Sequence, residues 1–270
     1  MTPPGGVTLV GAGDIADCGP SGDEATAKLL DGIEGTVFTA GDNAYEDGSA
    51  SQYQDCYAPT WGRHRARTRP SPGNHEYHTS GASGYYGYFG DLAGPSGRGY
   101  YAYDLGAWRI YSLNSNCGDA PGGCDAGGAQ VAWLRADLAQ NPRTCVAAYW
   151  HHPLFSSGDH GNHPDMADIW QALYDAGAEV VIEGHDHHYE RFAPMDASGA
   201  LDAAKGIRSF VVGTGGRGLY DLDDIKPNSE VRNNTTHGVI SFTLRGGDYD
   251  WKFVPAASGS FTDSGSASCH

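Results

Sequence analysis

Histidine, which binds metal ions and transfers protons near neutral pH, is concentrated in short segments of this sequence. Nine of the twelve histidines lie within residues 75–78, 151–163 and 185–188. His151, His185 and His187 follow apolar runs that we interpret as buried strands. Histidines with a purely structural role would be scattered along the chain, so we interpret these three as metal ligands.

Oxygen-bearing side chains follow other apolar runs in the same way. Asp14 comes after the run 7–10, Asp42 after the run 36–40, and Asn74 after a Pro-Gly turn. The carboxyl ends of parallel strands meet at one edge of a sheet, where α/β proteins bind their ligands. Carboxylate, amide and imidazole donors in this number exceed the needs of one ion, and they suit iron, zinc or manganese. The sequence therefore predicts a two-metal centre in which Asp42 bridges ions about 3.5–4 Å apart.

The elements that must position these residues alternate between strands and helices. Further strands are expected at residues 145–150, 180–182, 207–213, 239–244 and 249–254, with a hairpin at 100–113. Helices are expected at residues 21–30, 52–61, 129–139 and 165–176. This alternation is typical of α/β proteins, and it predicts a single domain, residues 1–270, with two stacked mixed sheets flanked by helices. The last dozen residues, from about Ala256, are expected to form a loosely ordered tail that is tied down by a disulfide.

The Gly- and Tyr-rich segment 81–99 has two interpretations. It can be a packed Ω-loop that covers apolar surface. It can equally form a wall of a substrate cleft. The sequence favours neither, so both interpretations stay open at this point.

The charge of the chain limits its partners. The sequence has 33 acidic and 17 basic residues, which gives a net charge of −16. We therefore expect no broad basic surface for nucleic acid or for an anionic membrane. No apolar run has the roughly 20 residues of a membrane-spanning helix. An anionic substrate would need local positive charge, which metal ions can supply. The oligomeric state stays open.

The cysteines indicate an oxidising compartment. There are six of them and none forms a CxxC pair, which favours disulfides over a thiolate zinc site. Six cysteines allow 15 pairings, among which we predict Cys117–Cys124, Cys18–Cys56 and Cys145–Cys269. We therefore expect a secreted protein from which a signal peptide has been removed. The alternative is a cytosolic protein with six reduced, buried thiols.

Five short motifs, in order, resemble the metal-binding blocks of a known family. They are Gly13-Asp14, Gly41-Asp42-Asn43-Ala44-Tyr45, Gly73-Asn74-His75-Glu76, His151-His152-Pro153 and Gly184-His185-Asp186-His187. In this order, over about residues 7–215, they resemble the calcineurin-like metallophosphoesterases, and most closely the purple acid phosphatases. The resemblance implies a four-layer αββα sandwich. It also implies that one metal is held by Asp14, Asp42, Tyr45 and His187, and the other by Asp42, Asn74, His151 and His185.

Tyr45 distinguishes the purple acid phosphatases from the rest of that family. Most metallophosphoesterases place a histidine two residues after the first aspartate, where this chain has Ala16, which cannot bind a metal. Tyr45 lies three residues after Asp42, where purple acid phosphatases supply a phenolate. A phenolate is a hard anionic donor, so the resemblance implies Fe³⁺ beside Tyr45 and a divalent zinc, manganese or iron ion beside it. The alternative is a core tyrosine next to two zinc or two manganese ions.

The resemblance also assigns roles to other polar residues. His75 and His160 match the positions of substrate-facing histidines, and either can protonate the leaving group. We expect His163 at the surface, and we expect His152 and His188 to pack or hydrogen-bond behind the ligands. Glu76 and Asp186 are candidates for orienting ligand imidazoles. Arg191 either contacts phosphate or forms a structural salt bridge.

The function implied by the resemblance is hydrolysis of a small phosphate monoester by hydroxide at the two metals. A phosphodiesterase or nucleotide-directed hydrolase with the same ions is an alternative, because the ligand motifs do not define the leaving group. A metal-loaded extracellular binding protein without turnover is a third possibility. The presence of every ligand motif and of both proton-donor candidates argues against it.

Overall fold

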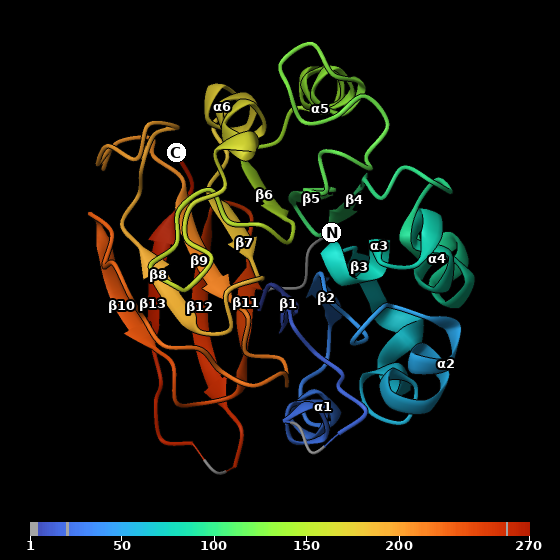
Figure 1. The fold of residues 1–270 in the computed structure, drawn as a ribbon. Coiled ribbons are helices and arrows are strands. Elements are labelled where there is room, and N and C mark those ends of the chain that lie inside the picture. The colour runs from blue at the N-terminus through green and yellow to red at the C-terminus, as the bar shows by residue number, and fades with distance from the viewer. Residues whose placement is uncertain (1–4, 20–21, 258) are drawn as a thin grey trace.

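The computed structural model describes residues 5–19, 22–257 and 259–270, and within them two β-sheets are stacked (Figure 1). Within these residues the first sheet has six strands in the order β13-β12-β11-β1-β2-β3. Their bounds are β1 Val7–Ala12, β2 Thr36–Ala40, β3 Thr68–Ser71, β11 Gly238–Leu244, β12 Asp248–Pro255 and β13 Ser264–Ser268. The strands β1, β2 and β3 are parallel, and β11 pairs with β1 in the antiparallel sense.

The second sheet has, in the same ranges, seven strands in the order β10-β8-β9-β7-β6-β5-β4. Their bounds are β4 Tyr101–Leu105, β5 Trp108–Ser112, β6 Cys145–Tyr149, β7 Val180–Glu183, β8 Tyr189–Phe192, β9 Arg208–Val212 and β10 Ser229–Asn233. Its centre, β5-β6-β7-β9, is parallel. The hairpin predicted at residues 100–113 is confirmed as the antiparallel pair β4 and β5.

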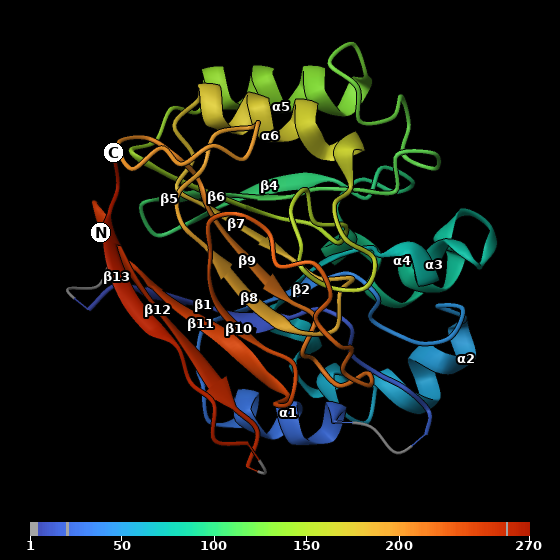
Figure 2. The same cartoon turned by 60° about the vertical axis from the view of Figure 1, so that its left-hand side comes forward.

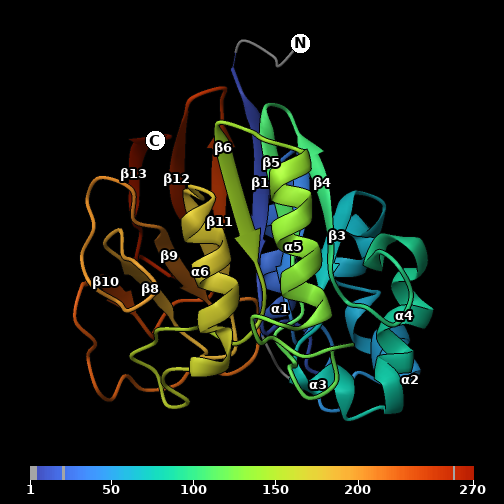
Figure 3. The same cartoon turned by 90° about the horizontal axis from the view of Figure 1, so that it is seen from above.

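Helices cover the outer face of each sheet. Figure 2 shows the sheets between α5 and α6 on one side and α1 on the other, and Figure 3 shows α5 beside α6. The helices are α1 Asp23–Asp31, α2 Ala50–Gln52, α3 Asn74–Tyr77, α4 Ser83–Phe89, α5 Ala129–Gln140 and α6 Ala167–Asp175. Tyr53–Tyr57 forms a π-helical turn, and 3₁₀ turns lie at Trp61–Arg67, Ser80–Ala82, Gly90–Ala93 and Pro164–Met166.

The core lies between the two sheets, with a second apolar layer under α5 and α6. Phe38 of the first sheet packs on Tyr149 of the second, with ring centroids 5.4 Å apart, and Phe210 packs on Phe242 at 5.3 Å. The sides of α5 and α6 that face the second sheet are apolar and buried. Leu134 of α5 is one of the residues buried there. The predicted αββα sandwich is therefore confirmed.

A few elements differ from those predicted from local sequence patterns. The expected tail is wrong for residues 264–268, which form β13 on the edge strand β12. Its Ser-Gly-Ser-Ala-Ser sequence has low β-propensity, so only pairing with β12 makes it a strand. The helix expected at 52–61 is broken into a π-helical turn and a loop. The helix expected at 21–30 begins at Asp23, and Ser21 lies outside the described residues.

The Gly- and Tyr-rich segment packs on apolar residues, as the first interpretation expected, but through the helix α4 and not as an Ω-loop. Within it, α4 buries Tyr85 and Phe89. The Phe89 ring contacts the rings of Tyr53 and Tyr57, with centroids 5.7 and 5.6 Å apart. These aromatic contacts close the end of the first sheet beyond β3.

All the predicted disulfides are confirmed. Cys18 is bonded to Cys56, Cys117 to Cys124, and Cys145 to Cys269. The last of these joins Cys269, directly after β13 of the first sheet, to the first residue of β6 in the second. Among the helices of the described ranges, none has both the length and the apolar character needed to cross a membrane.

Candidate metal centre

Three candidate ligands have a backbone conformation that is rare for residues other than glycine. Asp14 follows β1 with a φ of 61°, Asp42 follows β2 with a φ of 47°, and His185 follows β7 with a φ of 71°. This left-handed conformation costs roughly 1–3 kcal/mol and persists only where the surroundings enforce it. The backbone N–H of His185 donates to Asp14 Oδ2 at 2.8 Å, across the two sheets. The strain is therefore concentrated where the sheets bring the candidate ligands together.

Glu76 holds two of the ligand loops in register. Its Oε1 accepts hydrogen bonds from the backbone N–H of Asn43 (2.9 Å) and from the hydroxyl of Tyr53 (3.0 Å). Its Oε2 accepts from the backbone N–H of Gly73 (2.7 Å), next to Asn74. The expectation that Glu76 orients a ligand imidazole is therefore wrong, since these partners are backbone amides and a phenol. Its role is to join the loop after β2 to the turn that presents Asn74.

The first group of candidate ligands, which we call the Tyr45 side, consists of Asp14, Tyr45 and His187. The Tyr45 hydroxyl donates to Asp14 Oδ1 at 2.8 Å and lies 3.2 Å from His187 Nε2. His187 Nδ1 donates to the carbonyl of Gly218 at 2.7 Å, which leaves Nε2 with a free electron pair. Burial raises the pKa of Tyr45 well above its usual value, and the carboxylates of Asp14 and Asp42 raise it further. A cation among these groups would favour the phenolate over the phenol.

The second group, the His185 side, consists of Asn74, His151 and His185. His151 Nε2 lies 3.0 Å from Asn74 Oδ1 and 3.2 Å from His185 Nδ1. His151 Nδ1 donates to the carbonyl of Ala40 at 2.8 Å, so Nε2 is again the free nitrogen. Asp42 joins the two sides: its Oδ2 lies 3.3 Å from His151 Nε2.

The electrostatics of this cluster suit cations. Burial alone would raise the pKa of Asp42, but the adjacent His151 and His75 hold it well below its usual range. Conversely, burial would lower the pKa of His151, and Asp42 raises it to about 9. A buried carboxylate needs such a positive partner, and a metal ion can take that place and leave His151 a neutral ligand. Donor atoms of Asp14, Asp42 and His151 lie within 4.8 Å of one another, so the residues fit metal binding.

His75 lies at the edge of the cluster with one nitrogen facing it. Its Nδ1 donates to the carbonyl of Glu46 at 2.5 Å, and its Nε2 lies 3.8 Å from Asp42 Oδ2. Its ring packs on Tyr45 with centroids 4.5 Å apart, and 23% of its side chain is exposed. His75 is therefore close to both the ligands and solvent, as a proton donor must be.

His160 lies against the His185 side. It is exposed, and its ring centroid is 4.3 Å from that of His185. Its backbone N–H donates to Asp186 Oδ1 at 2.9 Å, and the hydroxyl of Ser156 donates to the other oxygen of the same carboxylate. The expectation that Asp186 orients a ligand imidazole is thus wrong. Asp186 instead holds the loop that carries His160.

His163 is not the surface residue that we expected. It is half-buried, and its ring lies 4.8 Å from the rings of both His152 and His185. Its Nε2 is buried and has no hydrogen-bond partner within the described part of the chain. No sequence signal marked this burial, because His163 follows a loop and not a strand.

Other polar residues near the ligands have structural partners. His188 Nε2 lies 3.1 Å from Glu190 Oε2, behind the ligands as predicted. Arg191 donates to Asp263 at 2.7 Å and pairs with Glu230, so the salt-bridge alternative holds.

Sequence reasoning missed three residues next to the ligands. The Tyr220 ring stacks on His187 with centroids 4.0 Å apart, and the Arg217 guanidinium lies 4.7 Å from the centre of the Tyr45 ring. The Ser115 hydroxyl accepts a hydrogen bond from the backbone N–H of His151 at 3.3 Å. Each of the three follows a strand of the second sheet, β9 or β5, and that position was the available signal.

Residues 7–189 match the calcineurin-like phosphoesterase family. The chain belongs to this family. An uncharacterised protein of Mycobacterium tuberculosis is 30% identical over 183 residues, covering 54% of this chain and 35% of that protein. Purple acid phosphatase 15 of Arabidopsis thaliana is 30% identical over 107 residues, which cover 37% of this chain and 19% of the relative. The chain thus spans about a third or less of these relatives.

A solved structure shares the fold over nearly the whole chain. It is a purple acid phosphatase from yellow lupin (Lupinus luteus) seeds, with a TM-score of 0.78 and 20% identity. The match covers 99% of this chain and 54% of the lupin chain. The αββα arrangement of the two sheets is therefore the fold of that enzyme.

Proposed function

We propose that this protein hydrolyses phosphate monoesters at a two-metal centre of purple acid phosphatase type. The observation that carries the proposal is the position of the Tyr45 hydroxyl, which contacts Asp14 and His187 while Asp42 connects this group to His151. Asp14, Asp42, Tyr45 and His187 would hold Fe³⁺. Asp42, Asn74, His151 and His185 would hold a divalent zinc, manganese or iron ion.

Bound ions would supply positive charge for the phosphate oxygens and lower the pKa of water. In hydrolysis, a water oxygen bonds to phosphorus while the bond from phosphorus to the ester oxygen breaks. The departing alkoxide must then gain a proton. His160 and His75 are the groups of this chain that can donate it, because both lie beside the ligands and are accessible to solvent.

The chain's own residues set the positions of these groups. The carbonyls of Ala40 and Gly218 fix which nitrogen of His151 and His187 faces the centre. Asp186 holds the His160 loop through its backbone. Such outer contacts typically contribute 10- to 100-fold to metal affinity or activity. The proposal also includes secretion, which the disulfides support.

Metal analysis and two substrates test the proposal. Purified protein should contain two metal ions per chain, one of them iron, and should be purple because of the phenolate-to-iron transition. It should hydrolyse p-nitrophenyl phosphate faster than bis(p-nitrophenyl) phosphate. Faster hydrolysis of the diester would favour the phosphodiesterase alternative. A protein that holds two metals but hydrolyses neither ester would contradict the proposal and favour a binding protein.

A further inference from the structure

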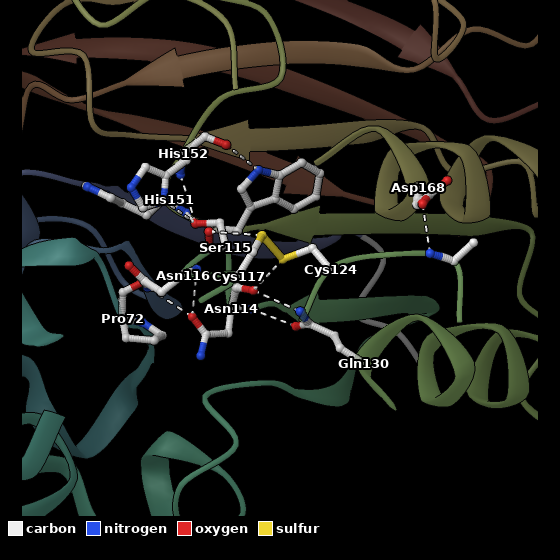
Figure 4. Close-up of a disulfide and its surroundings, with 12 residues drawn as sticks. Pro72, Asn114, Ser115, Asn116, Cys117, Cys124, Gln130, His151, His152 and Asp168 are labelled. Atoms are coloured by element: carbon white, nitrogen blue, oxygen red, sulfur yellow. Dashed lines mark hydrogen bonds between the residues drawn. A yellow bond between two sulfur atoms is a disulfide. The ribbon is translucent and has the colours of Figure 1, made fainter. Parts of the chain in front are cut away.

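A polar pocket of about 240 Å³ adjoins the His185 side of the candidate centre. One wall is the loop after β5, closed by the Cys117–Cys124 disulfide, and it contributes Ser115 and Asn116 (Figure 4). The other wall contributes His152 and His163. These two rings lie 4.5 and 4.8 Å from the ring of His185. The pocket therefore lies directly beside the candidate metal centre.

Hydrogen-bond counting fixes the tautomer of His152. The Ser115 hydroxyl oxygen accepts from the backbone N–H of His152 at 2.9 Å and from that of His151 at 3.3 Å, which uses both of its lone pairs. Its single hydrogen is then directed to His152 Nδ1, 2.8 Å away (Figure 4). Nδ1 is therefore an acceptor, and Nε2 carries the proton. In this tautomer His152, which lines the pocket, has an N–H donor at Nε2 and no free electron pair for a metal. One of its ring nitrogens lies within 4.8 Å of donor atoms of His151 and His185, at the border between the pocket and the candidate centre.

His163 also lines this pocket. Its Nε2 is buried and lacks a partner within the described ranges. An unpaired buried polar group costs about 1–3 kcal/mol, so a ligand whose binding turns this nitrogen into the pocket and pairs with it gains affinity. A hydroxyl group suits both histidines, because it can accept from His152 and can either donate to or accept from His163.

The negative charge of the pocket disfavours anionic ligands. Asp119 and Asp165 line it and are exposed, and none of the described lining residues is a lysine or arginine. An anionic group would be repelled by these carboxylates. An apolar group would leave the buried His163 Nε2 without a partner.

We propose that this pocket is the leaving-group subsite, and that it selects phosphate monoesters of neutral, polyhydroxylated alcohols. The inference rests on the proposed phosphatase function. It assigns His152 and His163 to binding the hydroxyls of the leaving group, while the hydrolytic step itself is unchanged. Asp119 and Asp165 select against anionic leaving groups.

Three esters with the same carbon skeleton test the subsite. Glycerol 2-phosphate has two free hydroxyls, isopropyl phosphate has none, and in 2-phosphoglycerate a carboxylate replaces one hydroxymethyl group. The kcat/KM ratio of glycerol 2-phosphate to isopropyl phosphate should be about tenfold larger in the wild type than in His163→Phe. Comparing this ratio between the two proteins cancels the intrinsic reactivity of the esters. Equal ratios would overturn the proposal, as would a loss of metal from His163→Phe, which would make His163 a ligand.

The exposed acidic residues provide a test with little risk to folding. In the double variant Asp119→Asn, Asp165→Asn, kcat/KM for 2-phosphoglycerate should rise severalfold relative to glycerol 2-phosphate. Asp91→Asn, at another exposed position, is the matched control and should leave the ratio unchanged. An unchanged ratio in the double variant would overturn the charge selection. Failure to hydrolyse even p-nitrophenyl phosphate would instead contradict the proposed phosphatase function.

Discussion

The two sides of the candidate centre differ in charge and in access. On the Tyr45 side, Asp14 and Tyr45 are buried, Tyr220 stacks on His187, and the Arg217 guanidinium lies over the Tyr45 ring. On the His185 side, the exposed His160 and the polar pocket lie next to the candidate ligands. The Tyr45 side is therefore the more closed of the two, with the partly exposed His75 against its ring, and the His185 side is the more open.

The candidate donor atoms on the two sides also differ in charge. Apart from the shared Asp42, the Tyr45 side offers a carboxylate and a phenol that becomes anionic on a metal. The His185 side offers an amide oxygen and imidazoles, all neutral. Anionic donors suit a trivalent ion and neutral donors a divalent one. In the proposed function, the tightly held ion and the substrate's leaving group would therefore lie on opposite sides.

Removal of the shared carboxylate should have the largest effect. Asp42→Ala should lose both metals and lower kcat/KM by roughly 10⁴-fold, because each ion provides several kcal/mol of transition-state stabilisation. Metal analysis and turnover of p-nitrophenyl phosphate measure this. Asp47→Ala, at an exposed acidic position, is the control. Near-wild-type turnover in Asp42→Ala would mean that Asp42 does not bridge the sides.

A chelator should distinguish the ion on the His185 side from the ion on the Tyr45 side. A mild chelator should remove the divalent ion first, because its side is open and its donors are neutral. Activity should fall by roughly 10³-fold while the purple colour stays, and added Zn²⁺ or Mn²⁺ should restore turnover. Loss of colour before loss of activity would reverse the assignment of tight and weak sides.

His160→Ala tests proton donation on the open side. General acid catalysis typically contributes 10²–10⁴-fold, and we expect a decrease in kcat of about 10²-fold with both metals retained. The effect should be smaller with p-nitrophenyl phosphate, whose leaving group needs less protonation than an alkoxide. Asp159→Ala, on the same loop, should keep the wild-type rate. If His160→Ala lost metal instead, His160 would have to be reassigned as a ligand.

Tyr45→Phe tests the closed side and should have the smallest effect on rate. Loss of the phenolate should remove the visible absorption of iron-loaded protein and lower activity by roughly 10- to 100-fold. The matched control is Tyr220→Phe, which keeps the ring stacked on His187 and should keep the colour. Unchanged absorbance in iron-loaded Tyr45→Phe would refute the phenolate role.

Much of the fold was predictable because its signals are local. The apolar runs before Asp14 and Asp42 and the hairpin turn at Gly106-Ala107 mark strands by their own composition. The strand β13 was not predictable, because its small residues become a strand only on the edge of β12. The burial of His163 was missed for the same reason, since its neighbours come from other loops.

The types of the candidate ligands and their places at strand ends could be predicted from the sequence, because a strand and the residue that follows it are encoded locally. Which of these residues meet depends on the tertiary structure. Asp14 contacts His185 across 171 residues, and the Ser115 hydroxyl sets the tautomer of His152 across 37. These contacts exist because two sheets stack with their ligand-bearing ends together, which is a property of long-range packing. The segment after β9 then places Tyr220 and Arg217 over the Tyr45 side, while the polar pocket lies beside His185.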